Sequence, residues 1–285
     1  MNRQLALLIS SVFIIYLFIR DRKLRPMPSW GVWISLFWLV IIGTRPVSSW
    51  FGLGVQIENP DDYIEGSPLD RMIFAGLEIL GLYALSIRKT SFSKIVQANL
   101  WMFLFFIYWG ISITWSDYSF VSLKRWIKDV GNIIMVLIIL SEANPANAIR
   151  AVFARFAYIA IPLSVVLIKY FPELGRYYNR WTWDVAYCGV TTGKNALAST
   201  ILVCTLSLIW QLIETIKSRT HLIDKIDLTT RIVLILMAFW IFTIVNSSTA
   251  LIGLIIGIII LIYLSLPNAR TQIWRVGTYG LLTIM

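Results

Sequence analysis

The most regular feature of the chain is a succession of apolar blocks of roughly 15–20 residues, each closed by charged residues or by Pro, Asn and Ser. About 20 helical residues cross the hydrocarbon core of a bilayer, and lipid offers no partner to an unpaired backbone amide. Each block therefore predicts a membrane-spanning helix, and the whole pattern predicts an all-α, polytopic membrane helix bundle with about ten transmembrane helices. The expected spans lie near residues 4–19, 29–44, 69–87, 95–114, 122–140, 151–169, 195–213, 231–246, 249–266 and 273–285, in a single transmembrane domain over residues 1–285.

The loops between the expected spans differ in charge. Most of the 25 Lys and Arg residues fall on or beside one set of alternate loops, whereas the acidic stretch from Glu58 to Glu65 falls in the other set. Cytoplasmic loops of membrane proteins carry the excess of Lys and Arg, so the first set is expected inside and the N-terminus outside. The first apolar block is followed by its charges and lacks a small-residue cleavage site, which favours a retained helix over a signal peptide.

The composition supports the membrane assignment and excludes several other classes. The chain is 58% hydrophobic and 14% charged, with a mean hydropathy of +0.74, whereas soluble domains are about 25% charged. Its net charge of +10 lies mostly between apolar blocks, so the positive-inside rule explains it and no nucleic-acid partner is expected. Neither a metal-ligand spacing nor a glycine-rich phosphate loop is present, so no metal and no cofactor are expected. Cys188 falls in a loop and Cys204 in a span, so no disulfide is expected between them.

Cations on the expected outer side run against the topology rule and therefore indicate another purpose. Lys124, Arg125 and Lys128 crowd one broad face of a helix that begins on that side, because they are three or four residues apart. A helix N-terminus already favours an anion, and Asp129 can offset one cation through Arg125. One hypothesis is a specific anion site; the other is an interfacial anchor on lipid phosphates, with Trp126 as its aromatic belt residue.

Two more inward-running helices present polar groups on the expected outer side. One opens with Lys194 and Asn195, and the other follows Ser247 and Ser248, for which simple capping is the alternative explanation. The loop before Lys194 adds Arg176 and Arg180 together with Tyr and Trp residues. Such a loop suits a ligand with a phosphate and a sugar, because cations bind phosphate and flat rings stack on sugar faces. It equally suits an aromatic belt on the membrane.

Glu78 is the main ionisable residue in the middle of an expected span. An ionisable side chain at this depth is a functional candidate, and the alternative is a neutral glutamic acid hydrogen-bonded between helices. His221, the only histidine, falls in an expected cytoplasmic loop and is not a candidate for a base on the outer face.

Four segments, in order, resemble those of bacterial O-antigen ligase-like proteins, a family that includes exopolysaccharide polymerases. They are Trp115–Gly131 (WSDYSFVSLKRWIKDVG), Ile161–Arg176 (with IPL and IKYFPELGR), Gly189–Asn195 (GVTTGKN) and Asn246–Gly253 (NSSTALIG). The resemblance extends over roughly residues 100–266.

The resemblance implies a C-type membrane glycosyltransferase fold in the bacterial inner (plasma) membrane. Such proteins take a glycan from an undecaprenyl diphosphate carrier on the periplasmic face, without a metal, and pass it to the lipid A core of lipopolysaccharide or to another glycan. The role of the family's basic residues, which are thought to grip the diphosphate, transfers by position to Lys124, Arg125, Lys128, Arg176 and Lys194.

In the family a large periplasmic loop follows a late span and supplies a histidine and an arginine. This sequence ends where that loop is expected, so the chain is expected to be the N-terminal part of a longer protein, with its catalytic histidine beyond Met285. An inactive fragment is then one alternative to an enzyme. A transporter or flippase of an anionic lipid-linked glycan, with Glu78 and the cations along its path, is a second, and a non-catalytic membrane subunit is a third.

Overall fold

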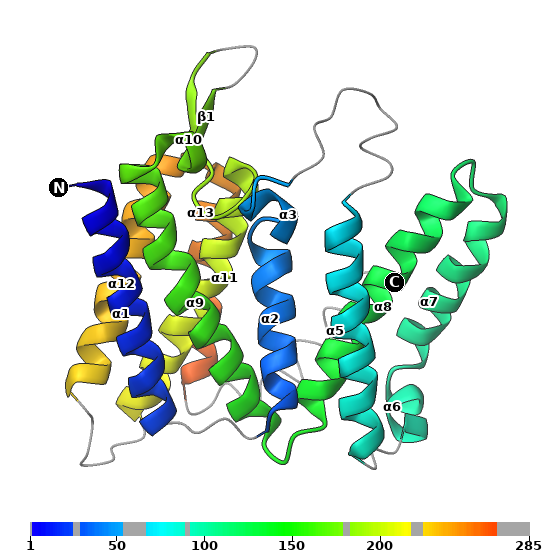
Figure 1. Ribbon diagram of the computed structural model, residues 1–285. Helices are drawn as coiled ribbons and strands as arrows, with labels where there is room; N and C mark the ends of the chain where they lie inside the picture. The colour runs from blue at the N-terminus through cyan, green and yellow to red at the C-terminus, as the bar shows by residue number, and fades with distance from the viewer. Residues whose placement is uncertain are drawn as a thin grey trace. The chain divides into compact units, whose positions relative to one another are not determined.

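The computed structural model describes residues 2–24, 29–53, 67–88, 92–178, 183–217 and 225–266. Over these residues the chain is helical apart from one two-stranded hairpin, which confirms the predicted all-α class (Figure 1). The longer helices coincide with apolar blocks, whose backbone can satisfy its own hydrogen bonds in lipid only as a helix. The helices are α1 (Arg3–Leu24), α2 (Gly31–Gly43), α3 (Val47–Trp50), α5 (Pro68–Ile87), α6 (Phe92–Ala98), α7 (Leu100–Ser112), the 3-10 turn η1 (Ile113–Trp115), α8 (Ser119–Leu140), α9 (Pro145–Tyr170), α10 (Pro172–Gly175), α11 (Lys194–Lys217), α12 (Lys225–Val245) and α13 (Ser248–Ser265), and the strands are β1 (Arg176–Tyr178) and β2 (Val185–Tyr187).

Five of the described helices are long and apolar enough to cross a membrane: Arg3–Lys23, Pro145–Tyr170, Lys194–Lys217, Ile226–Val245 and Ser248–Ser265. The chain is therefore a membrane-embedded helical protein. Helix α13 shows this most plainly, because its apolar window has a mean hydropathy of 2.5 although only 11% of it is buried within the protein. An apolar surface of this extent is stable when lipid covers it.

The other expected spans that fall within the described residues are also helical but differ from the five in length or charge. Helices α2 and α7 have 13 residues each, about 20 Å at 1.5 Å per residue, which is less than the ~30 Å of a hydrocarbon core. Helices α5 and α8 have 20 and 22 residues but carry charged side chains. The expected span at 95–114 is divided at Asn99 into α6 and α7. The expected span at 273–285 lies outside the described residues, as do Glu58, Glu65 and His221.

The chain divides into two compact units. Unit 1 comprises Met1–Ile19 and Phe153–Met285, and unit 2 comprises Arg20–Val152. Each unit has its own helix packing, and each is described by itself below.

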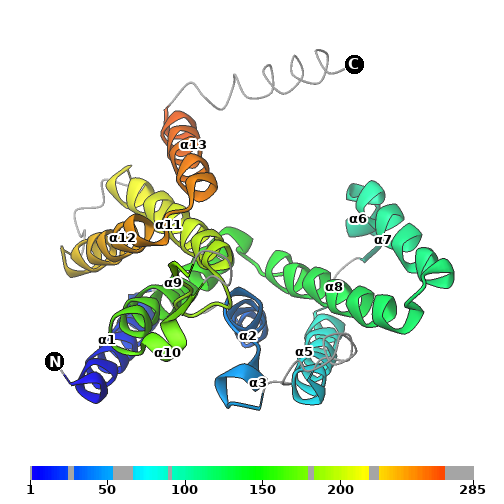
Figure 2. The same cartoon turned by 90° about the horizontal axis from the view of Figure 1, so that it is seen from above.

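In unit 2, helices α2, α5 and α8 pack against one another, and the N-terminal part of α8 leads away toward α7 (Figures 1 and 2). Glu78 of α5 lies against Gly131 of α8, and Gly81 of α5 lies against Ile134 of α8, so these two helices run parallel. Their shared apolar core with α2 is formed by Ile34, Trp38, Ala84, Ile134, Met135 and Ile138.

Helix α2 runs in the opposite direction to α5 and α8. Gly31 lies against Ile138 near the end of α8, whereas Trp38, two turns later in α2, lies against Gly131, nearer the start of α8. The Ser35 hydroxyl also donates to the Met135 carbonyl at 3.1 Å. The helix directions within unit 2 therefore agree with a chain that crosses back and forth.

A charged cluster closes unit 2 where α5 and α8 end. The Arg88 guanidinium forms an ion pair with Glu142, and it donates hydrogen bonds to the Ile138 carbonyl and to the hydroxyls of Ser29 and Ser141. The side chains of Arg88 and Glu142 are only 18% and 5% exposed. This cluster joins the segment before α2 to the ends of α5 and α8.

In unit 1, helices α1 and α9 are antiparallel. Arg3, at the start of α1, pairs with Glu173 of α10 at 2.8 Å, whereas Phe18, near the end of α1, packs edge-on against Tyr158 in the middle of α9. The N-terminus of α1 therefore lies at the same end of unit 1 as the C-terminus of α9.

Helices α11 and α13 of unit 1 are parallel neighbours (Figure 2). Gly253 of α13 lies against Leu202 of α11, and Gly257, one turn on, lies against Leu206. The N-termini of the two helices therefore lie at one end, which we call the Lys194 end of unit 1. Arg231 of α12 donates to Thr215 at the opposite end of α11 at 3.0 Å.

We predict that Gly131→Ala destabilises the protein by about 1–3 kcal/mol, because the added methyl group would overlap the Trp38 ring and lie 2.6 Å from Glu78 Oε1. Gly76→Ala on α5 is the control, because its added methyl group would meet no atom within 4 Å. Unfolding by SDS titration from detergent micelles measures both. Equal midpoints for the two variants would contradict the close packing of α2, α5 and α8.

We also predict that Arg88→Ala costs about 3 kcal/mol, because it leaves the buried Glu142 carboxylate without its cation. The matched control is Arg3→Ala, which removes a pair whose side chains are 59% and 53% exposed and should cost less than about 1 kcal/mol. The same titration applies, and a larger loss for the Arg3 variant would refute the assignment.

Candidate functional site

The basic segment of α8 lies further into the helix than the sequence indicates. Helix α8 begins at Ser119 rather than Ser122, after a turn in which Ser119 Oγ donates to the Ser116 carbonyl at 2.9 Å. Lys124 and Lys128 consequently lie in the second and third turns, beyond the free amides of the first turn. The contribution of the helix N-terminus to an anion site at Lys124, Arg125 and Lys128 stays a prediction, since only the Lys124 ammonium reaches back to a residue of the first turn, Phe120.

Aromatic faces hold both lysines of this segment. The Lys124 ammonium lies 4.8 Å from the centroid of Phe120 on the same helix, and the Lys128 ammonium lies 4.7 Å from the centroid of Phe74 on α5. Arg125 and Lys128 are exposed. A ring face attracts a cation without neutralising it, so the contact with Phe74 positions the exposed Lys128 ammonium and leaves its charge in place.

The position of Trp126 argues against its predicted role as a belt residue. Its indole N–H donates to the Phe106 carbonyl of α7 at 3.0 Å, and its ring lies against Gly110 of α7. A belt tryptophan directs its polar edge toward lipid headgroups. Trp126 instead joins α8 to α7, so the anchor hypothesis loses its aromatic component.

Asp129 interacts with Asn132 rather than with the basic segment. Asn132 Nδ2 donates to Asp129 Oδ1 at 2.9 Å, and Asn132 Oδ1 accepts the indole N–H of Trp38 at 2.7 Å. The amide of Asn132 thus connects α8 to α2. Asp129 therefore belongs to a series of hydrogen bonds through Asn132 to Trp38, instead of offsetting the charge of Arg125 as expected.

Glu78 lies at the junction of α2, α5 and α8. Its Oε1 is buried against Gly131 and, among the described residues, has no hydrogen-bond partner. Trp38 contacts the same glycine and packs edge-on against Phe74, with centroids 4.9 Å apart. The ring that holds Lys128 is therefore one turn of α5 away from Glu78.

Arg71 is a further candidate that no sequence motif singled out. The parallel register of α5 and α8, continued from Glu78 and Gly131, places Arg71 at the level of Lys124. Arg71 is exposed and lies on the same helical face as Phe74, three residues later. Its spacing in the sequence could have identified it, because Arg71 lies seven residues before Glu78. Seven residues are about two helical turns, so the two side chains lie on the same face of the helix.

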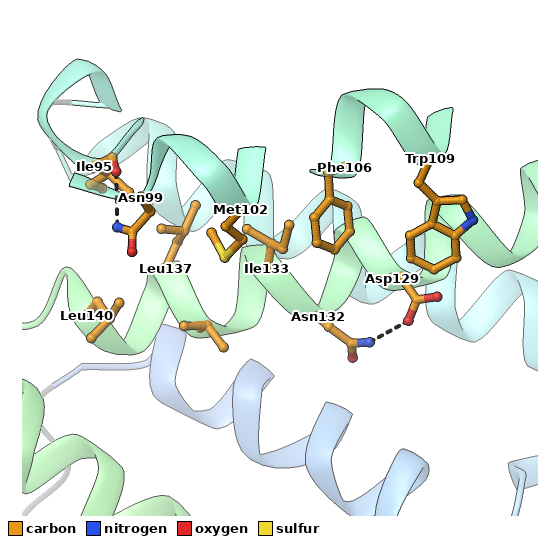
Figure 3. A pocket seen from close by; sticks show the side chains of 11 residues that line it. Ile95, Asn99, Met102, Phe106, Trp109, Asp129, Asn132, Ile133, Leu137 and Leu140 are labelled. Carbon is orange, nitrogen blue, oxygen red and sulfur yellow. Dashed lines mark hydrogen bonds between the residues drawn. The ribbon is translucent and has the colours of Figure 1, made fainter. Parts of the chain in front are cut away.

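Two apolar grooves lie on either side of the contact between α7 and α8. The larger, about 600 Å³, is lined by side chains of α5, α7 and α8, including Trp126, Val130 and Ile134. The smaller, about 270 Å³, is lined by Asn99, Met102, Phe106, Trp109, Asp129, Asn132 and neighbouring apolar residues (Figure 3).

The polar groups of the smaller groove do not converge. Figure 3 shows Asp129 and Asn132 beside Trp109 at one end and Asn99 at the other, where the Asn99 amide donates to the Ile95 carbonyl at 3.1 Å. The larger groove begins beside the basic segment, since Trp126 lines it.

In unit 1 the structure brings several predicted residues to the Lys194 end. Arg176 follows α10, where its Nε donates to the Ile168 carbonyl at 2.8 Å and its guanidinium lies 5.5 Å from the centroid of Tyr187. Lys194 is the first residue of α11, as predicted, and its backbone N–H faces the Tyr177 hydroxyl at 3.5 Å. Lys194 and Asn195 are exposed.

The serines before α13 lie at this same end because α13 is parallel to α11. Ser247 is in the N-cap position but makes no side-chain capping hydrogen bond, so the capping explanation does not account for it. Ser248 is the first residue of α13 and is exposed. Arg180 lies outside the described residues.

The turn before α11 requires a glycine at residue 189. Gly189 has a φ of +49°, and a Cβ there would lie 2.9 Å from the Ser164 side chain on α9. Val190 and Thr191 are buried, and Thr191 Oγ1 donates to the Cys188 carbonyl at 2.8 Å. This compact turn fixes the position of Lys194. Among the described residues, no group of three or more His, Cys, Asp or Glu side chains is arranged to hold a metal ion.

No protein-family model, no curated protein and no solved structure matches this chain significantly. The resemblance to O-antigen ligase-like proteins therefore rests on the four sequence segments alone.

We predict that Asn132→Leu destabilises the protein by about 1–3 kcal/mol, because it leaves the Trp38 indole N–H without its acceptor. Asn99→Leu is the matched control, because the Asn99 side chain donates to the Ile95 carbonyl in the adjoining turn rather than to another helix. SDS titration compares the two variants. A greater loss for Asn99→Leu would argue against Asn132 as the link between α2 and α8.

Proposed function

We propose that the protein transfers or polymerises a glycan carried on undecaprenyl diphosphate, at the outer face of a bacterial inner membrane. The observation that carries this proposal is the basic segment Lys124, Arg125 and Lys128 on α8 of a membrane-embedded chain, where ring faces position two of the cations. A diphosphate is the lipid-borne group that such a cluster suits, because it offers several anionic oxygens. The four family-like segments support the same substrate class.

The proposal includes about ten spans with the N-terminus outside. Helices α5 and α8 run parallel to each other and opposite to α2, and helices α11 and α13 run parallel to each other. A chain whose successive helices cross the membrane in alternating directions would have these same helix directions within each unit. The excess of Lys and Arg on one set of loops supports the same orientation.

In the proposed reaction a hydroxyl of the acceptor, a glycan or the lipid A core, attacks the anomeric carbon of the donor sugar. The new bond from the acceptor oxygen to that carbon forms as the bond to the diphosphate oxygen breaks, and the diphosphate leaves with the electron pair. The acceptor hydroxyl proton passes to a base that is not assigned among the described residues. Lys124, Arg125 and Lys128 stabilise the charge on the departing diphosphate.

Unit 1 supplies a second set of polar groups in this proposal. Arg176, Lys194, Asn195, Ser247 and Ser248 are assigned to the phosphate and sugar groups of the glycan, because they lie at one end of the unit. Arg176 keeps terminal guanidinium nitrogens for a ligand while its Nε binds the Ile168 carbonyl. The larger groove beside Trp126 receives the apolar part of the carrier.

A transporter or flippase of an anionic lipid-linked glycan is the second candidate. The division of the expected span 95–114 at Asn99 supports it, because transporters commonly use discontinuous helices at their substrate sites. Glu78, with its buried Oε1, would then lie beside the path.

The test is display of surface glycan in cells whose only copy of the gene carries a substitution. We predict that Lys124→Ala combined with Lys128→Ala lowers display about tenfold at unchanged protein level, since leaving-group charge loses its stabilisation. Lys217→Ala, an exposed cation at the opposite end of α11 from Lys194, should leave display unchanged.

Unchanged display in the double variant would refute the assigned role. A proteoliposome assay with labelled carrier and no acceptor separates the two candidates. Movement of the carrier across the bilayer without any acceptor would favour the transporter.

A further inference from the structure

The hairpin of β1 and β2 extends beyond the ends of helices α9 and α11 (Figure 1). Its strands are antiparallel, with Arg176 opposite Tyr187, Tyr177 opposite Ala186 and Tyr178 opposite Val185. The hairpin base is tied to unit 1, because the backbone N–H of Cys188 donates to the Gly175 carbonyl at 2.9 Å. The strands therefore have a fixed base and project away from the helices.

The two faces of this hairpin have different environments. Successive side chains in a strand point to opposite faces, so Tyr177 lies on one face, with its hydroxyl at the start of α11. Tyr178 lies on the other face together with Arg176, Tyr187 and Val185. On that second face Tyr178 is 66% exposed, and the Arg176 guanidinium is stacked against Tyr187.

Trp183, just before β2, is the most exposed aromatic residue among the described residues of the hairpin. It is 78% exposed, and its φ of 57° places it in the left-handed region. That conformation costs a bulky residue roughly 1 kcal/mol or more. An indole that is this exposed recovers little of the cost by burial within the protein. Residues in strained conformations cluster at ligand-binding sites, which makes Trp183 a candidate for contact with a ligand.

We propose that Tyr178 and Trp183 form a carbohydrate-binding platform that stacks against sugar rings of the glycan chain. This inference rests on the proposed function and names a second subsite for the same substrate. The flat apolar faces of sugars match exposed aromatic rings, and sugar hydroxyls match the Tyr178 hydroxyl and the Arg176 guanidinium, which lies on the same face of the hairpin as Tyr178. The strands project past the ends of α9 and α11 (Figure 1), so the proposal requires the rings to lie in water outside the bilayer.

The first measurement locates the rings relative to the membrane. A nitroxide on Trp183→Cys is examined in proteoliposomes, with the unsubstituted chain as the background control because both native cysteines are buried. The platform requires greater collision with a water-soluble nickel complex than with oxygen. Greater collision with oxygen would show that the residue lies in lipid and would overturn the proposal.

The second measurement tests the ligand. Oligosaccharides cut from the surface polysaccharide of cells that carry the gene are titrated against the purified, detergent-solubilised chain by calorimetry. We expect Tyr178→Ala and Trp183→Ala each to weaken binding about tenfold, with Tyr178→Phe retaining most of it because the ring remains. Tyr83→Ala is the matched control, because Tyr83 is a 59% exposed tyrosine of α5.

Each outcome separates this proposal from the one on which it rests. No saccharide binding, or binding that survives both alanine variants, overturns the platform even where the Lys124 and Lys128 variant loses glycan display. Capture of a protein by the hairpin, lost in the same alanine variants while saccharides do not bind, overturns it in favour of a protein partner. Glycan display that survives loss of the two lysines, alongside saccharide binding that depends on Tyr178, refutes the diphosphate assignment and leaves a glycan-binding membrane protein.

Discussion

The structure of unit 2 depends on the close approach of three helices at Gly131. A hydrogen in place of a side chain lets the Trp38 ring of α2 and the Glu78 carboxyl of α5 both reach the backbone of α8. Apolar side chains gain little from leaving lipid, so membrane helices associate through tight packing and interhelical hydrogen bonds. The contact at Gly131 supplies the packing, and the bond from Trp38 to Asn132 supplies the hydrogen bond one residue away. These contacts fix the register that brings Phe74 under Lys128.

The sequence predicted the class of structure well because one physical constraint decides it. Apolar segments in lipid must form helices, and helices occur at every expected span that falls within the described residues. The start of α8 was misplaced because hydropathy marks where a block becomes apolar, whereas the helix begins with the polar turn at Ser116 and Ser119. The break at Asn99 was missed for a related reason, since a single asparagine barely changes the average hydropathy of its block.

The sequence could identify candidate residues, but it could not predict which residues they contact. Charge bias identified Lys124, Arg125 and Lys128, and the start of α11 at Lys194 follows from the polar run before an apolar block. Pairings required the structure, because they depend on which helices are neighbours. Asp129 contacts Asn132 rather than Arg125, and Trp126 contacts α7 rather than the membrane surface. Arg71 became a candidate only through the register of α5 against α8.

Within each unit, cations at one end of the helices are paired with carboxylates, and cations toward the other end lie against aromatic rings. Arg88 and Arg231 are paired with the carboxylates of Glu142 and Asp227, and these side chains are largely buried. At the opposite end of its own unit, Lys128 lies against the ring of Phe74 and Arg176 against the ring of Tyr187, whereas Arg3 forms an exposed ion pair with Glu173. A carboxylate cancels the charge of its partner, whereas a ring face leaves the charge in place. The first arrangement stabilises a fold. The second maintains a positive potential that an anionic ligand can neutralise, which is the physical basis for proposing a role of these cations in binding a diphosphate.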